Sequence, residues 1–556
     1  MKKFKILFLN PINYAATSVA EIPPLGLAYI IEAIRDLGHY CKVIDFDINR
    51  EIAKDFENLL CRFNPDAIGI SITTPQVIHM LELLHTVSNR CSKAKVIVGG
   101  PHATVAYESL LKIENINIDA VVIGEGEETF RELVIKEFSS FETIAGLAWK
   151  EDGIVKRSNS RPPMLSLDKY GLKDREIFDW WLYPGFYPAG DGPNFGMMST
   201  RGCPFACKFC SSANVFGRKH RRREIDSILN EIENLQRMYG AEEISFFDDL
   251  FTANKRWLDN FCTQMLNRKI KIKWKCLSRV DTVDENILKK MKAAGCWLIC
   301  FGIESGDKQI LSNVDKKIDL NKAKLVLQAT KSVGIRTFHF YMIGHVGENP
   351  ENFKNTINFA KETAPDIYQL GITTPFPGSH IYESNKTFAI QNYGDFDYRI
   401  QKFSKDDHPS AGCPMTLGTM EALINEFKSE LRKVGSKDWQ EFSLSKKFKA
   451  KFRVIASTKN KLTIEITNDG DIPWSEEYQI RIGIREHTEN NSITREHRIY
   501  FPKTIKKHDS YVIQYEVDDT VKSGHIDIVK ENYFWFNDIQ DSGLKFSQNG
   551  SQNLCI

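Results

Sequence analysis

Short apolar runs alternate with helix-like periodicity through the first 150 residues of the chain. The segment Pro24–Leu37 has apolar residues at helical spacing and stops at Gly38. Five runs are typical of buried strands: Lys5–Leu9, Lys42–Phe46, Ala67–Ile72, Lys95–Gly99 and Ala120–Ile123. Continuous apolar strands separated by helices are typical of a parallel sheet covered on both faces. The pattern therefore predicts a doubly wound α/β domain over residues 1–150.

The segments that follow these strands share a composition. Small polar residues and glycines fill the stretches Asn10–Asn13, Ser71–Thr74, Gly99–His102 and Gly124–Glu127. Ligands of doubly wound sheets bind at the carboxyl ends of the strands, and glycine lets the backbone approach a ligand closely. We therefore expect a ligand site at this edge.

A second repeating pattern follows. Residues 151–190 are predicted to be a connector, because Arg161-Pro162-Pro163 cannot continue a helix. Over residues 191–400, a strand followed by a helix recurs about six times, with strands expected at 196–200, 243–248, 272–277, 297–303, 336–343 and 367–372. Six units are too few for a closed eight-stranded barrel. The pattern predicts a partial (β/α)6 barrel with its chemistry on the loops after the strands.

The C-terminal pattern is different. Residues 401–445 are predicted to be a helical connector. Over residues 446–556, runs such as Phe452–Ile455 and Lys461–Ile466 alternate with period two, and turn residues such as Asn468–Asp471 separate them. Short alternating strands separated by turns predict an antiparallel β-sandwich.

Composition narrows the function classes. The net charge of +2 gives no electrostatic argument for a nucleic-acid partner. No apolar segment is long enough to span a membrane, and the run Ile6–Leu9 is too short for a signal peptide. We expect a cytoplasmic protein with no membrane span, in which the 12 cysteines are reduced.

Three cysteines have ligand spacing. Cys203, Cys207 and Cys210 form a C-x3-C-x2-C sequence after the first barrel strand. Thiolates bind iron–sulfur clusters and zinc. A structural zinc site needs a fourth ligand, and the nearest candidate, His220, lies in a basic run. A three-cysteine cluster leaves one iron without a protein ligand, and the resemblance of this loop to the radical S-adenosylmethionine (SAM) superfamily implies a catalytic [4Fe–4S] cluster held by these three residues.

The cysteine loop resembles that of the radical S-adenosylmethionine (SAM) superfamily. The segments Phe246–Phe251, Lys275–Arg279, Phe301–Gly306 and Tyr341–Glu348 resemble the strand ends of the same family, although Val346 stands where the family usually has proline. The resemblance implies that the open iron binds SAM, and that reduction by a flavodoxin- or ferredoxin-type donor cleaves it to a 5′-deoxyadenosyl radical. It also implies a SAM site formed by Phe209, Asp248, Arg279, Glu304, Ser305, Ile343 and Gly344.

Structural alternatives exist for several of these residues. Asp248 could cap the next turn, and Arg279 could form an internal ion pair. The basic run Arg218–Arg223 is expected to face solvent or to pair with carboxylates, rather than to bind an anionic substrate. Glu304 follows an apolar strand, and a buried carboxylate needs a partner, which favours the SAM contact.

A doubly wound domain before such a barrel resembles the cobalamin-binding subfamily. The cobalamin D-x-H-x-x-G motif is absent from the loop Asn10–Tyr14, so cobalamin binds without a protein imidazole or the domain is vestigial; we favour binding. His102 is expected to lie in a turn near the corrin rather than to ligate cobalt. The residues that the resemblance implies for cobalamin are Pro11, Ser71, Thr73, Thr74, Gln76, Gly99, Gly100, Pro101, His102, Gly124, Glu125 and Gly126.

The subfamily most often transfers a methyl group from methylcobalamin to an unactivated carbon, and we expect this methyltransferase reaction on a small-molecule or glycan-linked substrate. A non-methylating rearrangement, ring contraction or oxidative cyclisation is the alternative, and a catalytically silent cobalamin sensor is a third possibility. The substrate candidates are His339, Tyr341, His345 and Tyr368, which could equally be packing residues.

The predicted sandwich resembles accessory β-domains of glycan-biosynthesis proteins. Trp474 and Trp535 would grip a sugar if they are exposed, but each is more typical of a core residue.

Overall fold

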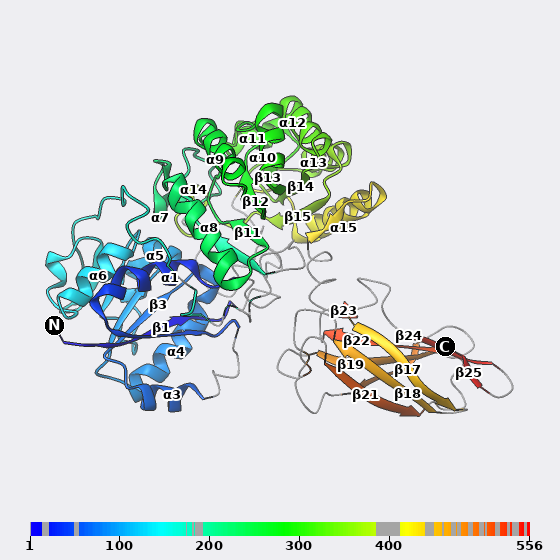
Figure 1. Ribbon diagram of the computed structural model, residues 1–556, viewed down its shortest axis with the longest axis horizontal. Coiled ribbons are helices and arrows are strands. Elements are labelled where there is room, and N and C mark those ends of the chain that lie inside the picture. Colours follow the sequence, from blue (N-terminus) through cyan, green and yellow to red (C-terminus); the bar gives the residue numbers. More distant parts are fainter. Residues whose placement is uncertain are drawn as a thin grey trace. The chain divides into compact units, whose positions relative to one another are not determined.

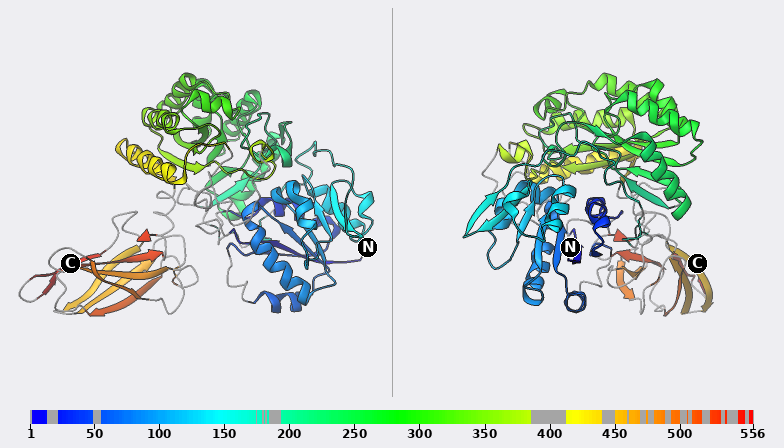
Figure 2. Two further views of the ribbon diagram at one scale, coloured as in Figure 1. Left: turned by 180° about the vertical axis from the view of Figure 1, so that it is seen from behind. Right: turned by 60° about the vertical axis from the view of Figure 1, so that its left-hand side comes forward.

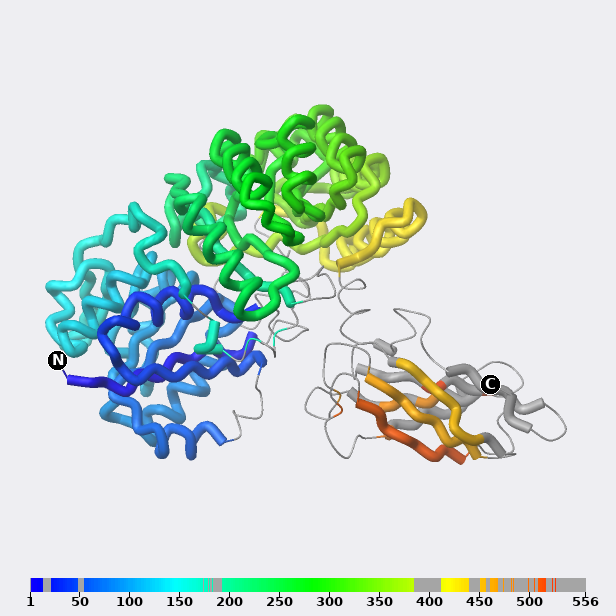
Figure 3. Tube along the Cα trace, viewed as in Figure 1, coloured from blue at the N-terminus to red at the C-terminus, as the bar shows by residue number. Residues whose placement is uncertain are grey.

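The computed structural model divides the chain into two compact units, residues 1–437 and 438–556. Figure 3 shows the Cα trace of both units. The structure describes residues 2–13, 22–48, 55–173, 175–178, 180, 183, 193–384, 412–439, 450–458, 461–468, 474, 480–487, 493–499, 505, 509–516, 523–530, 534–535, 544–549 and 553–555.

The first unit begins with the predicted parallel sheet. Its strand order is β2-β1-β3-β4-β5, continued by β6 and β7. The parallel strands are β1 (Lys5–Asn10), β2 (Tyr40–Asp45), β3 (Ala67–Ser71), β4 (Lys95–Gly99) and β5 (Ala120–Val122). The helices are α1 (Leu25–Ile34), α3 (Phe56–Phe63), α4 (Val77–Arg90), α5 (Pro101–Leu111) and α6 (Glu127–Ile135).

Helices cover both faces of this sheet. Figure 1 shows α1 and α6 on one face and α3 and α4 on the other. Two separate apolar cores form accordingly, one with Phe8 and Phe130 and one with Leu9 and Met80. The doubly wound domain is confirmed.

The first sheet continues past the predicted boundary at residue 150. Strands β6 (Leu147–Glu151) and β7 (Ile154–Arg157) form an antiparallel hairpin, and β6 also pairs antiparallel with β5. The connector predicted over 151–190 therefore starts later, after Arg157. The sequence reading missed this hairpin because β7 is largely exposed and carries no apolar run.

The partial barrel contains six parallel strands, as predicted. Their order is β8-β11-β12-β13-β14-β15 from one edge, and Figure 2 shows the helices on the outer side of the curved sheet. The strands are β8 (Asn194–Met197), β11 (Glu243–Phe246), β12 (Lys273–Ser278), β13 (Cys296–Glu304), β14 (Arg336–Ile343) and β15 (Ile367–Ile372). The helices are α8 (Ile225–Tyr239), α9 (Lys255–Asn267), α10 (Glu285–Ala293), α11 (Lys308–Asn313), α12 (Leu320–Ser332) and α13 (Pro350–Thr363).

Capping side chains explain where several barrel helices start. Asn254, Asp284, Asp307, Asp319 and Asn349 each accept backbone N–H groups of the first turn that follows. Such a cap contributes about 1 kcal/mol. Each lies shortly after a strand or loop, so these polar residues separate the strand pattern from the helix pattern.

One more helix covers the barrel. Helix α15 (Leu417–Lys433) lies within the helical connector predicted over 401–445, whose residues 401–411 and 440–445 are outside the described part. Its Phe427 ring lies 5.3 Å from Tyr341 and 5.4 Å from Tyr368, between ring centroids. The helix therefore packs on the outer side of β14 and β15.

The second unit consists of antiparallel strands, as predicted. A three-stranded sheet has the order β17-β18-β21, and a second sheet contains β20-β19-β22-β24-β25 with β23 beside β22. The strands are β17 (Ala450–Thr458), β18 (Lys461–Asn468), β19 (Ile480–His487), β20 (Ile493–Ile499), β21 (Ser510–Glu516), β22 (Ser523–Lys530), β23 (Phe534–Trp535), β24 (Leu544–Asn549) and β25 (Asn553–Cys555). In β18 alternate residues are buried.

Trp474 is fully buried, which is the packing alternative for this residue. Nothing is described for the Trp535 side chain. Among the described residues, no helix combines the length and the apolarity that crossing a membrane requires.

Candidate active site

The three motif cysteines lie in one tight loop between β9 (Thr200–Arg201) and β10 (Arg221–Arg222). The Cys210 N–H donates to the Cys207 carbonyl at 3.1 Å, and the Cys203 N–H donates to the Gly217 carbonyl at 3.3 Å. Gly202 has φ +86°, and a Cβ there would lie 2.6 Å from the Lys219 carbonyl oxygen. Only glycine therefore allows the loop to close this tightly at its first residue.

The thiols of this loop influence one another electrostatically. All three are free thiols. Cys210 is exposed, but the protein atoms packed around its sulfur raise the pKa of its thiol to about 11, and its two neighbouring cysteines add to the effect. The pKa of Cys203 is also raised, mainly by burial. Closely spaced thiols of this kind become thiolates when a cationic cluster offsets their charge.

The donor set fits an iron–sulfur cluster. Among the described residues, no three His, Cys, Asp or Glu side chains are close enough together to bind a single metal ion. A [4Fe–4S] cluster binds each thiolate to a different iron, so its sulfurs do not have to meet at one ion. The Arg279 guanidinium lies 3.9 Å from the Cys207 sulfur and supplies a positive charge beside the site.

Arg279 lies at the cysteine loop and also forms the internal ion pair. Its guanidinium lies 3.7 Å from the centre of the Phe205 ring, and it pairs with Asp281 at 2.8 Å. It also donates to the Lys316 carbonyl at 3.3 Å. The Arg279 side chain is therefore held against the cysteine loop, where it contacts the Cys207 sulfur.

The two aspartates after β11 differ in how many of their carboxylate oxygens accept hydrogen bonds. Asp248 is fully engaged, because one carboxylate oxygen accepts the Ser199 N–H at 2.7 Å and the other accepts the Ser199 hydroxyl. Burial raises the pKa of Asp248 to about 6. Asp249 accepts the Ser212 hydroxyl with one oxygen, while its buried Oδ2 has no hydrogen-bond partner. Asp249, not Asp248, has an available oxygen beside Cys203 and Cys210.

Glu304 holds a buried charge in a strained backbone. Its φ is +68°, in the left-handed region, and the register between β13 and β14 shifts just before it. Its carboxylate pairs with Lys316 at 2.9 Å, and both side chains are buried. A Cβ on Gly302 would lie 2.6 Å from that carboxylate. The Glu304–Lys316 ion pair therefore fits only because residue 302 is a glycine. Strain of this kind is common at functional sites.

Lys316 was not expected from the sequence. Its Nζ lies 5.9 Å from the centre of the Phe209 ring in the cysteine loop, so it reaches both Glu304 and the loop. The only sequence signal was its position in the loop after α11. Ser305, predicted with Glu304, instead contacts Thr356 at 3.1 Å and accepts the Asp307 N–H, which is a packing arrangement.

The segment after β14 forms a buried turn. The Glu348 carboxylate accepts the Gly344 N–H at 2.7 Å and the His345 N–H at 3.1 Å. Burial raises the pKa of Glu348 to about 7. The His345 ring lies 5.9 Å from the Phe209 ring, and burial lowers its pKa to about 3. The turn therefore reaches the cysteine loop, whereas the Ile343 side chain lies in the core.

Three predicted substrate residues lie on the outer side of the barrel sheet, where α15 packs. His339 and Tyr341 contact each other at 3.0 Å and are fully buried. Tyr341 and Tyr368 pack on Phe427 of α15. Because side chains alternate along a strand, Phe340 and Met342 face the opposite, inner side, and both are partly exposed. The substrate role predicted for His339, Tyr341 and Tyr368 does not fit this placement.

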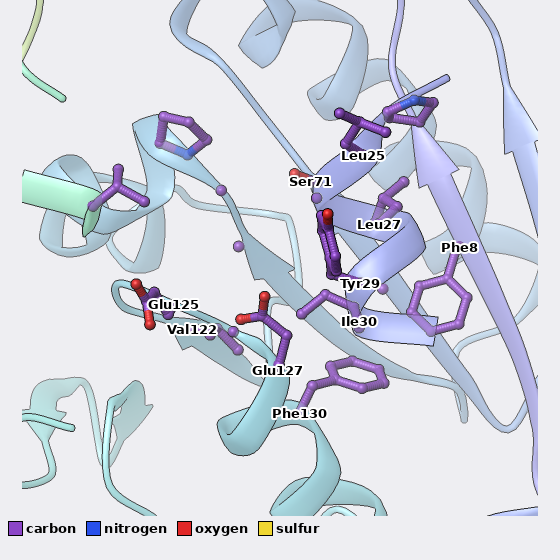
Figure 4. Close-up of a pocket in the computed structure, with 18 of the residues that line it drawn as sticks. Phe8, Leu25, Leu27, Tyr29, Ile30, Ser71, Val122, Glu125, Glu127 and Phe130 are labelled. Carbon is purple, nitrogen blue, oxygen red and sulfur yellow. The ribbon is translucent and has the colours of Figure 1, made fainter. Parts of the chain in front are cut away.

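A second site lies at the carboxyl edge of the first sheet. A cavity of about 430 Å³ is lined there mainly by apolar groups, and Figure 4 shows Phe8, Ile30, Val122 and Phe130 around it. Of the predicted cobalamin residues, Ser71, Gly99, Gly100, Pro101, Gly124, Glu125 and Gly126 line it. The barrel contributes Met198, Arg201, Val215, Phe216 and Phe247.

The remaining predicted cobalamin residues fix the loops beside the cavity. The Gln76 amide donates to the Asn10 side chain at 3.0 Å and to the Pro11 carbonyl at 2.7 Å. Its amide oxygen accepts from the N–H and the hydroxyl of Thr73. Gln76 therefore joins the loop after β1 to the loop after β3.

His102 has a comparable role. Its Nδ1 lies 3.0 Å from the Thr74 hydroxyl, and its N–H donates to the Ile72 carbonyl. Burial lowers the pKa of His102 to about 4, so the ring is neutral. This side chain joins the first turn of α5 to the loop after β3, and its expected place near the corrin stays a prediction.

The basic run of the barrel pairs with carboxylates. Glu125 binds the Arg221 guanidinium with both oxygens and accepts the Met164 N–H at 2.9 Å. Arg223 pairs with Glu231 at 2.6 Å and with Asp168 at 3.0 Å. Glu125 thus lines the cavity while its carboxylate holds the barrel against the first domain.

The cavity fits the apolar part of a large cofactor. A Cβ on Gly126 would lie 2.7 Å from Ile30 Cδ1, and a Cβ on Gly100 would lie 2.7 Å from the Ile72 nitrogen. These glycines keep the loops close together without filling the space between them. Mostly apolar walls with a few polar groups are typical of cofactor sites.

Comparison with known proteins agrees with this architecture. Residues 13–134 match the B12 binding domain family, and residues 197–360 match the radical SAM superfamily. An uncharacterised methyltransferase of Pyrococcus horikoshii is 34% identical over 398 residues, which is 70% of this chain and 84% of that protein. The anaerobic magnesium-protoporphyrin IX monomethyl ester cyclase of Rubrivivax gelatinosus is 27% identical, over 68% of this chain and 69% of that protein.

A solved structure shares the fold. The radical SAM methyltransferase TsrM of Kitasatospora setae, with cobalamin and a [4Fe–4S] cluster bound, superimposes with a TM-score of 0.60 and 18% identity, over 78% of this chain and 89% of that chain. The chain is therefore a member of the family of radical SAM enzymes that carry a cobalamin-binding domain, with a [4Fe–4S] cluster, SAM and cobalamin as its cofactors.

Proposed function

We propose that this enzyme transfers a methyl group from SAM, by way of cobalamin, to an unactivated carbon of a small-molecule substrate. The observation that carries the proposal is the cavity of the first domain, whose wall includes barrel residues next to the cysteine loop. When bound, the cluster, SAM and cobalamin supply the radical and methyl-transfer chemistry, and the protein supplies binding and orientation.

The cysteine side of the barrel is suited to a zwitterionic ligand. Cys203, Cys207 and Cys210 would hold the cluster. The available oxygen of Asp249 would accept a hydrogen bond from the SAM amino group, and Lys316 would approach the SAM carboxylate. Buried charges bind well only when each finds a counter-charge, and both charges are present in SAM.

The first domain would bind cobalamin by shape. Its apolar cavity would enclose the nucleotide tail, since planar aromatic groups gain most from apolar burial. Gln76 and His102 hold the adjacent loops in place before the ligand arrives, which lowers the entropy cost of binding.

The inner face of the barrel would contact the substrate. Phe340 and Met342 project there from β14 and are partly exposed. We infer that they pack on an apolar part of the substrate, since aromatic and thioether side chains contribute mainly dispersion and apolar contact. The electron would come from an external donor of the flavodoxin or ferredoxin type.

A labelling experiment tests the proposal. Anaerobically reconstituted protein is supplied with hydroxocobalamin, reductant, SAM labelled in its methyl group and an extract of small metabolites. The proposal predicts 5′-deoxyadenosine formation together with a product that carries the label. Turnover with an unlabelled product would instead support the rearrangement or cyclisation chemistry that the Rubrivivax relative represents. A cluster that cannot be reduced would favour the sensor alternative.

A further inference from the structure

Arg201 connects the cavity of the first domain with the cysteine loop. It is the last residue of β9 and directly precedes Gly202 and Cys203. Its guanidinium is buried and pairs with Glu127 at 2.6 Å. It also lies 5.1 Å from the centre of the Tyr29 ring. One side chain therefore contacts the first domain, while its backbone leads directly into the cluster-binding loop.

The partners of Arg201 form part of the cavity wall. Arg201, Glu127, Tyr29 and Phe216 all line the cavity, and Figure 4 shows Glu127 and Tyr29 there. The Phe216 ring lies 5.4 Å from the guanidinium. Phe216 ends α7 (Ala213–Phe216), which follows Cys210 directly in the loop. A ligand in the cavity would therefore touch the surroundings of Arg201 on several sides.

The backbone next to Arg201 has little freedom. Gly202 lies where any side chain would collide with the Lys219 carbonyl. Arg201 also pairs in register with Arg221 of β10, the strand that closes the loop. Arg201 has a second carboxylate partner, Glu125, at 4.0 Å. A buried guanidinium that loses its carboxylates is strongly destabilising, so Arg201 is expected to stay with Glu127 if Glu127 moves. Motion of the cavity wall is then passed to the first residues of the cysteine loop.

We propose that Arg201 is a positioning residue that couples occupancy of the cavity to the geometry of the cluster loop. Given the proposed function, on which this inference rests, filling the cavity with cobalamin changes the affinity of the cluster site for SAM. Two ligands that bias the same structural element change each other's affinity by the same factor.

Arg223 provides a matched control. It is also a buried arginine, and it pairs with Glu231 at 2.6 Å and with Asp168 at 3.0 Å. It does not line the cavity, and it follows the cysteine loop instead of leading into it. Arg223→Lys therefore removes a comparable buried guanidinium that interacts electrostatically with Tyr29 but neither lines the cavity nor pairs with Glu127.

The test measures binding rather than turnover. The full-length protein with its cluster reconstituted is titrated with SAM, with and without saturating hydroxocobalamin, and then with hydroxocobalamin, with and without SAM. In the wild type, each ligand should raise the affinity for the other by the same factor, roughly five- to tenfold. In Arg201→Lys this factor should fall to about one, while Arg223→Lys should keep the wild-type factor.

Electron paramagnetic resonance of the reduced cluster gives a second readout. Addition of hydroxocobalamin should shift the signal in the wild type and in Arg223→Lys, but not in Arg201→Lys. If Arg201→Lys does not retain a cluster, Glu127→Gln replaces it, since that variant leaves the loop sequence intact and removes the nearer of the two carboxylates that pair with Arg201.

The outcomes separate this inference from the proposed function. A wild-type protein that binds cobalamin and SAM independently, with an unchanged signal, overturns the coupling and leaves the proposed function standing. Coupling that survives in Arg201→Lys and in Glu127→Gln also overturns it. A wild-type protein that does not bind cobalamin at all overturns both.

Discussion

The two parallel sheets of the first unit present their carboxyl edges in opposite ways. At the edge of the first sheet, polar side chains such as Gln76 and His102 bond to neighbouring loops and leave an apolar cavity. At the edge of the barrel, polar groups remain available or strained, as with Asp249 Oδ2 and the backbone of Glu304. One edge is suited to recognition by shape, and the other to recognition by charge.

This difference follows from where polar groups can find partners. A buried polar group without a hydrogen bond costs about 1–3 kcal/mol. At the first edge the Gln76 amide avoids this cost, whereas the buried Tyr29 hydroxyl in the cavity wall has no hydrogen-bond partner. At the barrel edge, a few buried polar groups such as Asp249 Oδ2 have no hydrogen-bond partner within the protein. We expect a charged ligand to satisfy these groups, as is typical of a site built for reaction.

The largest expected effect breaks the barrel edge alone. Replacing Cys203, Cys207 and Cys210 together by alanine should abolish iron binding and reduce SAM cleavage to background, since no thiolate remains for the cluster. Hydroxocobalamin binding should persist, because the cavity is left intact. Iron and sulfide analysis with a cobalamin titration measures both. The control is Cys61→Ala, an exposed cysteine outside the loop; equal iron loss in that variant would contradict the assignment.

The next effect separates the two neighbouring aspartates. Asp249→Asn should weaken SAM binding by about 10- to 100-fold, since a hydrogen bond to a charged group contributes about 1.5–3 kcal/mol. Asp248→Asn should instead lower the melting temperature, because both oxygens of Asp248 bond to Ser199. Equilibrium dialysis with labelled SAM and thermal melts on the two variants give the comparison. Equal SAM affinity in Asp249→Asn and the wild type would remove Asp249 from the site.

A smaller effect tests recognition by shape at the first sheet. Ile30→Trp places a large ring at the cavity wall, where Ile30 lies in Figure 4, and should weaken cobalamin binding roughly tenfold, about 1.4 kcal/mol. Ile135→Trp is the control, because Ile135 is 46% exposed on α6 of the same domain. Fluorescence quenching by hydroxocobalamin measures both variants. If both bind with wild-type affinity, the cavity does not hold the cofactor.

The last prediction concerns Glu348, in the turn after β14, and its response to pH. Burial raises its pKa from 4.5 to about 7, so the folded state favours the protonated carboxyl. Below pH 4.5 both states are protonated and the group contributes no pH dependence. From pH 4.5 to 7 the unfolded chain releases the proton first, so stability falls with rising pH, by on the order of 1–3 kcal/mol.

Glu348→Gln should remove this part of the pH dependence. A glutamine oxygen can still accept the N–H groups of Gly344 and His345, so the turn is preserved. Melting temperatures at pH 5 and pH 8 should differ less in the variant than in the wild type. An unchanged difference would mean that Glu348 is ionised in the folded protein at both pH values.

Much of the fold was predictable because its signals are local. Apolar runs located β3, β4, β14 and β15 to within about a residue. The hairpin β6–β7 was missed, since an exposed edge strand such as Ile154–Arg157 has no apolar run to detect. Apolar patterns reveal buried strands, and most residues of this strand are exposed.

The site was predictable only in part. The cysteine spacing and the glycine-rich loops are sequence motifs, so both could be found. The role that we propose for Asp249 rather than Asp248 depends on which aspartate bonds to Ser199, a contact across 49 residues. Likewise, the side of β14 on which His339 and Tyr341 lie depends on the position of α15, which strand periodicity alone does not determine.

Glu304 shows what the molecule gives up for its chemistry. A glycine would adopt its backbone conformation without cost, whereas a side chain there costs about 1–3 kcal/mol. The chain nevertheless keeps a carboxylate at this position, opposite Lys316. Attempts to raise thermal tolerance by relaxing the strand end at this position would therefore leave the buried Lys316 ammonium without the carboxylate it pairs with.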